Sequence, residues 1–141
     1  MKPSYWLLKS EPAKYSFSQL QKDKKTNWDH VRNYQARNFL RAMKKGDLAV
    51  IYHSNDERSA VGIAEVVKEA YPDIDKEDPK GDWAQVDIKA VEAFLQPVTL
   101  ATIKATPALK DIALIKQSRL SCMAISEGHF NILKKMGGLS K

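Results

Sequence analysis

The chain has 141 residues, a length typical of one domain, and we expect residues 1–141 to form a single domain with its own core. Hydrophobic residues make up 43% and charged residues 28%, which excludes a disordered chain. The single cysteine, Cys122, excludes a disulfide framework and a multi-cysteine zinc site. No stretch has the apolar length of a signal peptide or a membrane span, so we expect a cytoplasmic protein (nuclear in a eukaryote) with no membrane partner.

The net charge of +6 is unevenly distributed along the chain. Lys and Arg outnumber Asp and Glu by 11 to 4 in residues 1–50 and by 7 to 2 in residues 101–141, whereas acidic residues lead by 11 to 5 in residues 51–100. If the two basic ends meet in the fold, they form a positive face suited to a phosphate backbone. A solvated, lysine-rich surface accounts for the same distribution equally well.

The first half of the chain predicts one strand and two helices. An aromatic and apolar strand at 4–9 ends at the Ser-Glu-Pro that follows. Ser16 and Gln19 form a capping box that begins a short helix through Gln21. Asn33 can cap a helix over 34–45, whose apolar residues recur at helical spacing and define a buried face: Ala36, Phe39, Leu40 and Met43.

From residue 47 the pattern changes to strands, which we predict at 47–53, 60–69 and 84–93. Gly62 indicates a bulge or a close backbone approach within the second of them. The remaining predicted segments are an acidic loop at 71–82, a short helix at 99–104, extended segments at 112–116 and 119–125, and a last helix at 127–136. Strands with helices in no regular βαβ order favour an α+β fold, a small mixed sheet curled toward a barrel with helices packed outside.

Most enzyme signatures are absent from the sequence. It contains no phosphate-binding loop, dinucleotide-binding glycine motif, nucleophile elbow or zinc-protease motif, and we expect neither catalysis nor a cofactor. His30, His53 and His129 share no metal-ligand spacing, and the acidic run at 73–78 lacks the glycine of a calcium loop, so we expect no metal site. Cys122 lies among apolar residues and is expected in the core.

Three polar and aromatic segments could bind a ligand. Residues 28–38, WDHVRNYQARN, combine two aromatic rings with amides and guanidiniums around a helix start, a set that can stack on a base, read its edge and hold phosphate. The other two, YHSN at 52–55 and QSRLS at 117–121, lie at predicted strand ends, where ligands often enter a barrel. Core packing of the aromatic rings and solvation of the arginines remain an alternative at this point.

Together these segments resemble the EVE domain family, within the PUA-like fold group. The resemblance runs in order through nearly the whole chain, in YWLLKSEP at 5–12, VRNYQARNFL at 31–40, YHS at 52–54, GIAEVV at 62–67, EAYPD at 69–73, Trp83 with Val86 and Asp87, and QSRLS at 117–121. It implies a PUA-like mixed β pseudobarrel similar to that of the YTH readers of methylated RNA. It also implies a function, the binding of a modified nucleobase, above all modified cytosine in DNA, in an aromatic-lined pocket.

Carried over residue by residue, the resemblance implies one pocket. Trp28 corresponds to the first tryptophan of YTH-like cages, and Trp83 is a candidate for the second. Arg37 and Arg41 are expected to contact phosphates from the exposed side of the helix at 34–45. His30 stands where the family commonly has glycine, which makes a positive φ less favourable there. The implied ligand-binding residues are Ser10, Trp28, Arg32, Asn33, Tyr34, Tyr52, His53, Ser54, Trp83, Arg119 and Ser121.

We therefore expect a monomeric, non-catalytic module that binds nucleic acid carrying a modified base and acts with a nuclease or another effector protein. Three alternatives remain: a nucleotide-processing enzyme that uses His53 with Asp29 or Glu65, an RNA-binding PUA-like module, and a protein-binding domain with a vestigial pocket. The enzyme requires a base and a nucleophile within hydrogen-bond reach. The protein-binding domain requires a contiguous exposed apolar patch.

Overall fold

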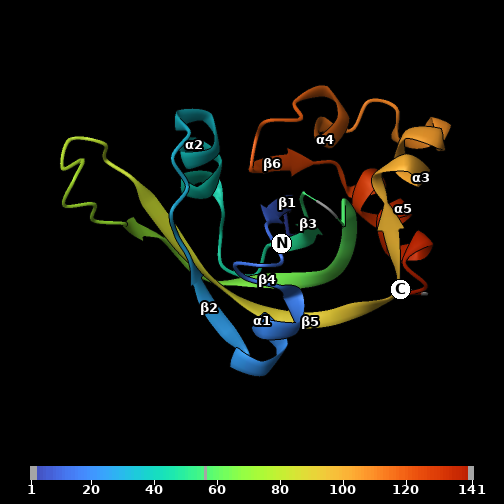
Figure 1. Ribbon diagram of the computed structural model, residues 1–141, viewed down its shortest axis with the longest axis horizontal. Coiled ribbons are helices and arrows are strands. Elements are labelled where there is room, and N and C mark those ends of the chain that lie inside the picture. The colour runs from blue at the N-terminus through green and yellow to red at the C-terminus, as the bar shows by residue number, and fades with distance from the viewer. Residues whose placement is uncertain (1–2, 56, 140–141) are drawn as a thin grey trace.

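The computed structural model describes residues 3–55 and 57–139, and Figure 1 shows how its elements are arranged. Six strands form one mixed sheet in the order β2-β5-β4-β3-β1-β6, in which β1 and β3 run parallel and the other neighbours antiparallel. The strands are β1 (Tyr5–Ser10), β2 (Lys25–Trp28), β3 (Leu48–His53), β4 (Ser59–Pro72), β5 (Ala84–Thr99) and β6 (Cys122–Ile125). The helices are α1 (Phe17–Asp23), α2 (Tyr34–Ala42), α3 (Leu100–Ala105), the 3-10 turn η1 (Pro107–Leu109), α4 (Ala113–Lys116) and α5 (Glu127–Met136).

The predicted α+β class, a curled mixed sheet with helices outside it, is confirmed. The strands expected at 4–9, 47–53, 60–69 and 84–93 are β1, β3, β4 and β5. β4 and β5 are longer than expected and bend around β1 and β3, while the loop that joins them projects at one side of the molecule (Figure 1). Among the described residues, no helix combines the length and the apolar character needed to cross a membrane.

Helix α2 begins as predicted but ends earlier. Asn33 Oδ1 accepts a hydrogen bond from the Ala36 backbone N–H at 2.9 Å, and Ala36 and Leu40 are completely buried. The helix ends at Ala42 and not at residue 45, because the next backbone N–H groups take other partners. Lys44 N–H donates to the Asp47 carboxylate at 2.9 Å instead of continuing the helical ladder.

Two other predictions of local structure were wrong or incomplete. The apolar segment predicted as extended at 112–116 is the short helix α4, since a brief apolar run does not distinguish a strand from a buried helical turn. β2 was not predicted, because its four residues carry no alternating pattern and it is specified by antiparallel pairing with β5. The extended segment at 119–125 contains the shorter strand β6.

A buried carboxylate joins the start of β1 to the turn between α2 and β3. Asp47 is only 4% exposed. Its Oδ1 accepts from the Ser4 backbone N–H at 3.0 Å, and its Oδ2 accepts from Trp6 Nε1 at 2.9 Å in addition to the Lys44 N–H. Three donors thus replace the water that this carboxylate loses on burial.

The two basic parts of the sequence meet in the sheet. β1 lies between β3 and β6, and Tyr5 of β1 is opposite Ile125 of β6 in antiparallel register. On its other side β1 pairs in parallel with β3, so that Lys9 is beside Tyr52 and Ser10 beside His53. The ends of β1 and β3 therefore present polar side chains at one place in the fold.

Gly62 lies at a shift in strand register and at a close contact with its backbone. The register between β4 and β5 shifts between Ala60 and Gly62, and the ring of Phe17 packs directly against Gly62. A Cβ on this residue would lie 2.5 Å from Phe17 Cζ. Phe17 is itself buried at the start of α1.

We expect Gly62→Ala to lower the free energy of unfolding by about 1–3 kcal/mol, because the added methyl group would overpack the Phe17 ring. Urea denaturation followed by circular dichroism measures the change. Gly128→Ala in α5 is the matched control, since a Cβ there has its nearest contact at 3.8 Å and alanine favours the helix. A Gly62 variant as stable as the Gly128 variant would contradict the close packing described here.

Candidate functional site

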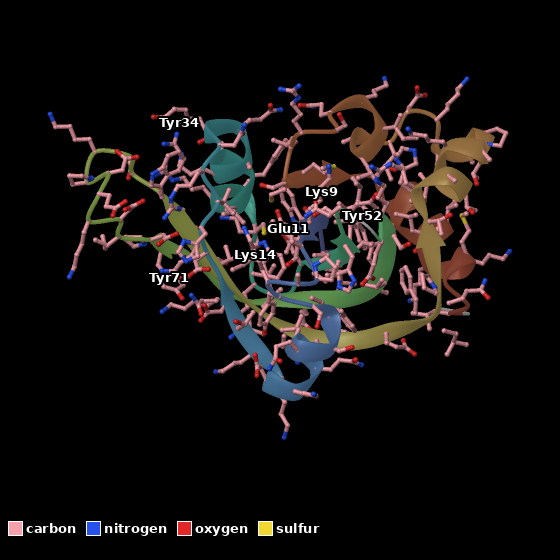
Figure 2. The ribbon with its side chains drawn as sticks, viewed as in Figure 1. Lys9, Glu11, Lys14, Tyr34, Tyr52 and Tyr71 are labelled. Atoms are coloured by element: carbon pink, nitrogen blue, oxygen red, sulfur yellow. The ribbon has the colours of Figure 1, made fainter. Side chains whose placement is uncertain are left out.

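A cavity of about 400 Å³, which we call the Trp28 cavity, opens between the ends of β1 and β2. Its walls also include the turn into α1, the loop after β2 and the segment before β6. Figure 2 places Lys9, near the end of β1, and Glu11 and Lys14, which follow β1, near the centre of the molecule. The lining residues are Lys9, Ser10, Lys14, Tyr15, Thr26, Asn27, Trp28, Asp29, His30, Val31 and Ser121.

Trp28 gives this cavity an aromatic wall. It is the last residue of β2, and its pairing with Val86 of β5 fixes its backbone. The residue is 8% exposed, and the Tyr15 ring meets the indole edge-on with the ring centroids 6.3 Å apart. The Tyr15 contact and the pairing of β2 with β5 hold the indole in place while it contributes surface to the cavity. Stacking against a planar ligand requires a ring fixed in this way.

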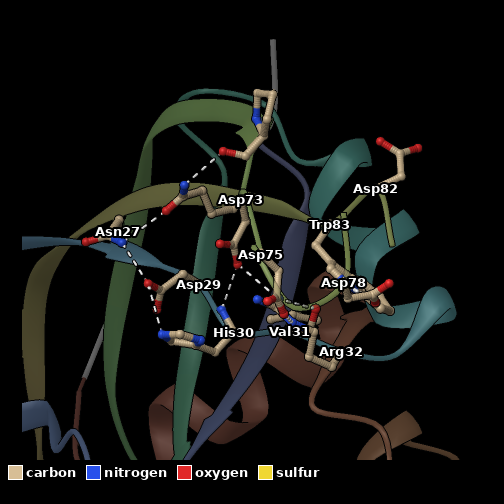
Figure 3. A network of polar contacts seen from close by, with 12 residues as sticks. Asn27, Asp29, His30, Val31, Arg32, Asp73, Asp75, Asp78, Asp82 and Trp83 are labelled. Atoms are coloured by element: carbon tan, nitrogen blue, oxygen red, sulfur yellow. Dashed lines mark hydrogen bonds and ion pairs between the residues drawn. The ribbon is translucent and has the colours of Figure 1, made fainter. Parts of the chain in front are cut away.

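A carboxylate in the cavity wall is held by its neighbours. Asn27 Nδ2 donates to Asp29 Oδ2 at 3.1 Å and to Gln85 Oε1 at 3.0 Å, and His30 Nε2 lies 3.5 Å from Asp29 Oδ2 (Figure 3). These contacts orient Asp29 while leaving carboxylate lone pairs available. Its chemistry suits acceptance of a hydrogen bond from an amino group of a ligand.

Ser10 closes the wall between β1 and α1. Its Oγ donates to the Tyr15 carbonyl at 2.6 Å, which fixes the turn that carries Lys14 and Tyr15. The Lys9 amine is half-buried beside it and donates to the Ser118 carbonyl at 2.6 Å. Burial lowers the pKa of the Lys9 amine from its usual value, because the charged form loses water.

Side chains of the acidic loop hold the loop that follows Trp28 by accepting hydrogen bonds from it. His30 adopts the positive φ of 61° that its side chain disfavours, and its backbone N–H donates to Asp73 Oδ2 at 3.0 Å. Arg32 Nη1 donates to the same oxygen at 3.0 Å, and its Nε donates to Asp75 at 3.3 Å (Figure 3). Although burial opposes it, these hydrogen bonds and the Arg32 charge hold the pKa of Asp73 below its usual value. Arg32 thus positions the loop and does not line the Trp28 cavity.

The second candidate cage tryptophan lies outside this cavity. Trp83 stacks on Tyr34 with centroids 5.1 Å apart and 19° between the planes, and its Nε1 donates to Asp78 at 2.9 Å. Tyr34 is 62% exposed and has the Arg37 guanidinium over its ring. Arg41 donates to the Asp82 carbonyl and pairs with the Asp82 carboxylate, both at 2.8 Å. In Figure 2, Tyr34 lies at one side of the molecule, away from Lys9.

Of the remaining implied residues, Asn33, Tyr52, Ser54 and Arg119 lie at two adjoining cavities of about 360 Å³ each. The Tyr52 cavity shares Lys9 with the Trp28 cavity, and the Arg119 cavity shares Ser118 with the Tyr52 cavity. The Tyr52 cavity is lined by Lys9, Tyr52, Ser54, Asn55, Arg58, Leu100, Leu114 and Ser118. The Arg119 cavity is lined by Asn33, Gln35, Lys116, Gln117, Ser118, Arg119 and Leu120. The implied single pocket is thus divided: Ser10, Trp28 and Ser121 line the first of three neighbouring cavities.

His53 is buried and lines none of these three cavities. Its Nε2 accepts the Phe17 backbone N–H at 3.0 Å, so the proton of the neutral ring is on Nδ1, which lies 2.8 Å from Glu57 Oε1. Both ring nitrogens are thus engaged in holding the start of α1. Among residues 3–55 and 57–139, no group of three or more His, Cys, Asp and Glu side chains could hold a metal ion.

Several residues of the Trp28 cavity were not predicted as ligand-binding, notably Lys9, Tyr15, Asn27 and Asp29. Lys9 appeared in the sequence only as the end of a strand, and Asn27 belongs to the strand that was not predicted. Asp29 belongs to the candidate segment 28–38 but was given a role of its own only in the alternative catalytic pair. The signal that could have found them is their immediate adjacency to Ser10 and Trp28.

We expect Asp73→Asn to lower the free energy of unfolding at pH 7 by about 1–2 kcal/mol, because the loop loses a charged acceptor. The pKa of Asp73 is lower in the folded state than the unfolded value of about 3.9. Its stabilisation is therefore present above that pH and is lost as the pH falls through the folded value.

Urea denaturation at pH 7 and at about pH 3 should show the gap between wild type and Asp73→Asn narrowing at the lower pH. Asp111→Asn is the control, since its carboxylate makes an exposed ion pair with Lys116 at 3.6 Å. An equal gap at both pH values would contradict this role of the Asp73 charge.

Comparisons with known proteins show similarity in sequence and in fold. Chicken thymocyte nuclear protein 1 is 38% identical to this chain over an alignment 161 positions long. The alignment covers 92% of this chain and 66% of the chicken protein. A crystal structure from Agrobacterium tumefaciens superposes with a TM-score of 0.91 at 41% identity, over 98% of this chain and 95% of that one. Human THYN1, solved in complex with DNA containing 5-methylcytosine, superposes with a TM-score of 0.86 at 34% identity, over 98% and 99%.

The family model of the EVE domain matches residues 4–136, which include all six strands and the helices between them. The match thus covers the residues of the Trp28, Tyr52 and Arg119 cavities. The chain belongs to the EVE domain family.

Proposed function

We propose that this chain is a non-catalytic module that binds DNA carrying a modified cytosine, with the modified base flipped out of the double helix into the Trp28 cavity. The observation that carries the proposal is a cavity of about 400 Å³ with an aromatic wall and an oriented carboxylate. The complex of human THYN1 with DNA containing 5-methylcytosine supports the same class of ligand for this chain.

The cavity residues divide the recognition of the base between them. The Trp28 ring stacks on the flipped base, which compensates for part of the stacking that the base loses in the duplex. Asp29 accepts a hydrogen bond from the exocyclic amino group of cytosine, a group that thymine lacks. The apolar side of the cavity, formed by Val31 and the two aromatic rings, accommodates the added methyl group.

The geometry favours binding over catalysis. Both nitrogens of His53 are engaged, and the residue does not line the cavity that contains Asp29. Cys122 is completely buried, and burial raises its pKa far above the range in which a thiolate forms. The catalytic pair considered from the sequence, His53 with Asp29, therefore does not face the Trp28 cavity together.

A module of this kind recognises a modified base in DNA, and another protein then acts on that DNA. Stacking of one base contributes on the order of 1–3 kcal/mol, so a single pocket gives modest affinity. We therefore place the chain with a nuclease or another effector that uses the bound DNA, in the cytoplasm or, in a eukaryote, in the nucleus. The chain spans 66% of the length of the chicken relative, so the activity of that whole protein is a separate question.

We expect Trp28→Ala to abolish the preference for a strand containing 5-methylcytosine over the unmodified strand, because the stacking wall is lost. Fluorescence anisotropy with labelled oligonucleotides measures both affinities, and an RNA strand of the same sequence tests whether RNA is the better ligand. Equal affinity of the wild type for all three strands, or a preference for RNA, would contradict the proposal.

A second variant is needed, because Trp28 is buried and its removal lowers the stability of the fold. Asp29→Ala should fold normally, because the side chain is about one-third exposed, and it should lose discrimination between 5-methylcytosine and thymine. Melting curves of both variants, recorded first, separate lost folding from lost recognition.

Arg37→Ala should weaken binding to modified and unmodified strands alike. The side chain lies partly buried on α2, where its guanidinium stacks over Tyr34, and it lines none of the three cavities. A guanidinium in that position reaches phosphate, which carries no information on the base. Removing one phosphate contact should also flatten the salt dependence by about one unit of slope. A selective loss for the modified strand would show that Arg37 contacts the base.

A further inference from the structure

The Tyr52 cavity has a chemistry different from that of the Trp28 cavity. Among the described residues, its lining contains two cationic side chains, Lys9 and Arg58, and no carboxylate. Ser54, Asn55 and Ser118 add neutral polar groups, and Leu100 and Leu114 form an apolar part. A cavity of this composition fits an anion that is attached to a less polar group.

Arg58 is held in place by the chain around it. Its Nε donates to the Asn55 carbonyl at 3.1 Å, which leaves the two terminal nitrogens of the guanidinium directed elsewhere. The Arg58 charge lies close enough to Tyr52 to oppose the rise that burial causes in the pKa of that phenol. Of the carboxylates in the described part of the chain, none forms an ion pair with Arg58 or with Lys9.

Lys9 connects this cavity to the site of the base. Its side chain lines both the Trp28 cavity and the Tyr52 cavity, and its Nζ lies 5.9 Å from the centroid of the Tyr52 ring (Figure 2). The amine is half-buried and donates to the Ser118 carbonyl, so an anion beside it would restore the interaction that it loses with water. An anion in the Tyr52 cavity is therefore adjacent to a ligand in the Trp28 cavity.

We propose that the Tyr52 cavity binds a backbone phosphate that flanks the flipped nucleotide, with Arg58 and Lys9 as its ligands. The inference rests on the proposed function, since it takes the flipped base in the Trp28 cavity as its reference point. Guanidinium and ammonium groups together supply charge-assisted hydrogen bonds to phosphate oxygens. The apolar part formed by Leu100 and Leu114 lies against the sugar. These ligands differ from Arg41, whose charge is neutralised by Asp82.

The test combines a protein variant with a neutral phosphate. Arg58→Gln and the wild type are titrated with a strand containing one 5-methylcytosine, and with two versions in which a methylphosphonate replaces the phosphate on either side of that nucleotide. We expect one of the two replacements to weaken wild-type binding about threefold to tenfold. The same replacement should have no further effect on Arg58→Gln, because the partner of that phosphate is already missing.

Two controls make the result specific. Lys135→Gln removes the same charge from α5, outside the three cavities, and should remain sensitive to the methylphosphonate. Lys9→Gln should reproduce the insensitivity of Arg58→Gln to that replacement, provided that its melting temperature is unchanged. Losses in Arg58→Gln that add to those of both methylphosphonates, or a wild type indifferent to both, would overturn the inference.

The experiment separates the inference from the proposed function. The ratio of affinities for modified and unmodified strands measures recognition of the base. The coupling between Arg58 and one phosphate measures the Tyr52 cavity. A protein that shows the coupling without the preference has the phosphate site but is not a reader of modified cytosine, and the reverse result removes the phosphate site alone.

Discussion

The structure depends on one buried carboxylate. Asp47 accepts hydrogen bonds from Ser4, Trp6 and Lys44, which belong to the segment before β1, to β1 itself and to the turn after α2. These bonds fix the start of β1 against the start of β3, and two parallel strands that begin together also end together. The side chains at their other ends, from Lys9 to His53, therefore meet at one place, although more than forty residues separate them in the sequence.

Two contacts near these strand ends then fix the start of α1. His53 accepts the first backbone N–H of α1, which orients the helix, and Gly62 leaves room for the Phe17 ring that follows. The turn before α1 then carries Tyr15 to the edge of Trp28, which β5 holds from the other side. The Trp28 cavity is thus the space left between strand ends whose positions were determined elsewhere in the fold.

The sequence predicted the elements that have a strong local signal. Asn33 and Ser16 cap helices as expected, and the four main strands lie where they were predicted, although β4 and β5 extend beyond the predicted ranges. It missed β2, whose only specification is its pairing with β5, and the family resemblance offered Trp83 as a candidate for the second cage tryptophan. A sequence shows that Trp28 and Trp83 are both present, but it does not show that the acidic loop carries Trp83 to the Tyr34 ring. The positive φ of His30 was likewise not predicted, because a backbone hydrogen bond to the distant Asp73 holds it.

The loop at 73–82 also determines the direction from which a polyanion can approach. It contains five acidic residues and two lysines, and it projects at one side of the molecule (Figure 1). Lys9, Arg58, Lys116 and Arg119, which line the cavities, carry the opposite charge. A polyanion is repelled by the acidic excess of the loop and attracted by the cationic lining of the cavities, so these two parts of the surface orient it as it approaches. The loop that positions His30 and Arg32 in the folded protein thereby also steers an approaching polyanion toward the cavities.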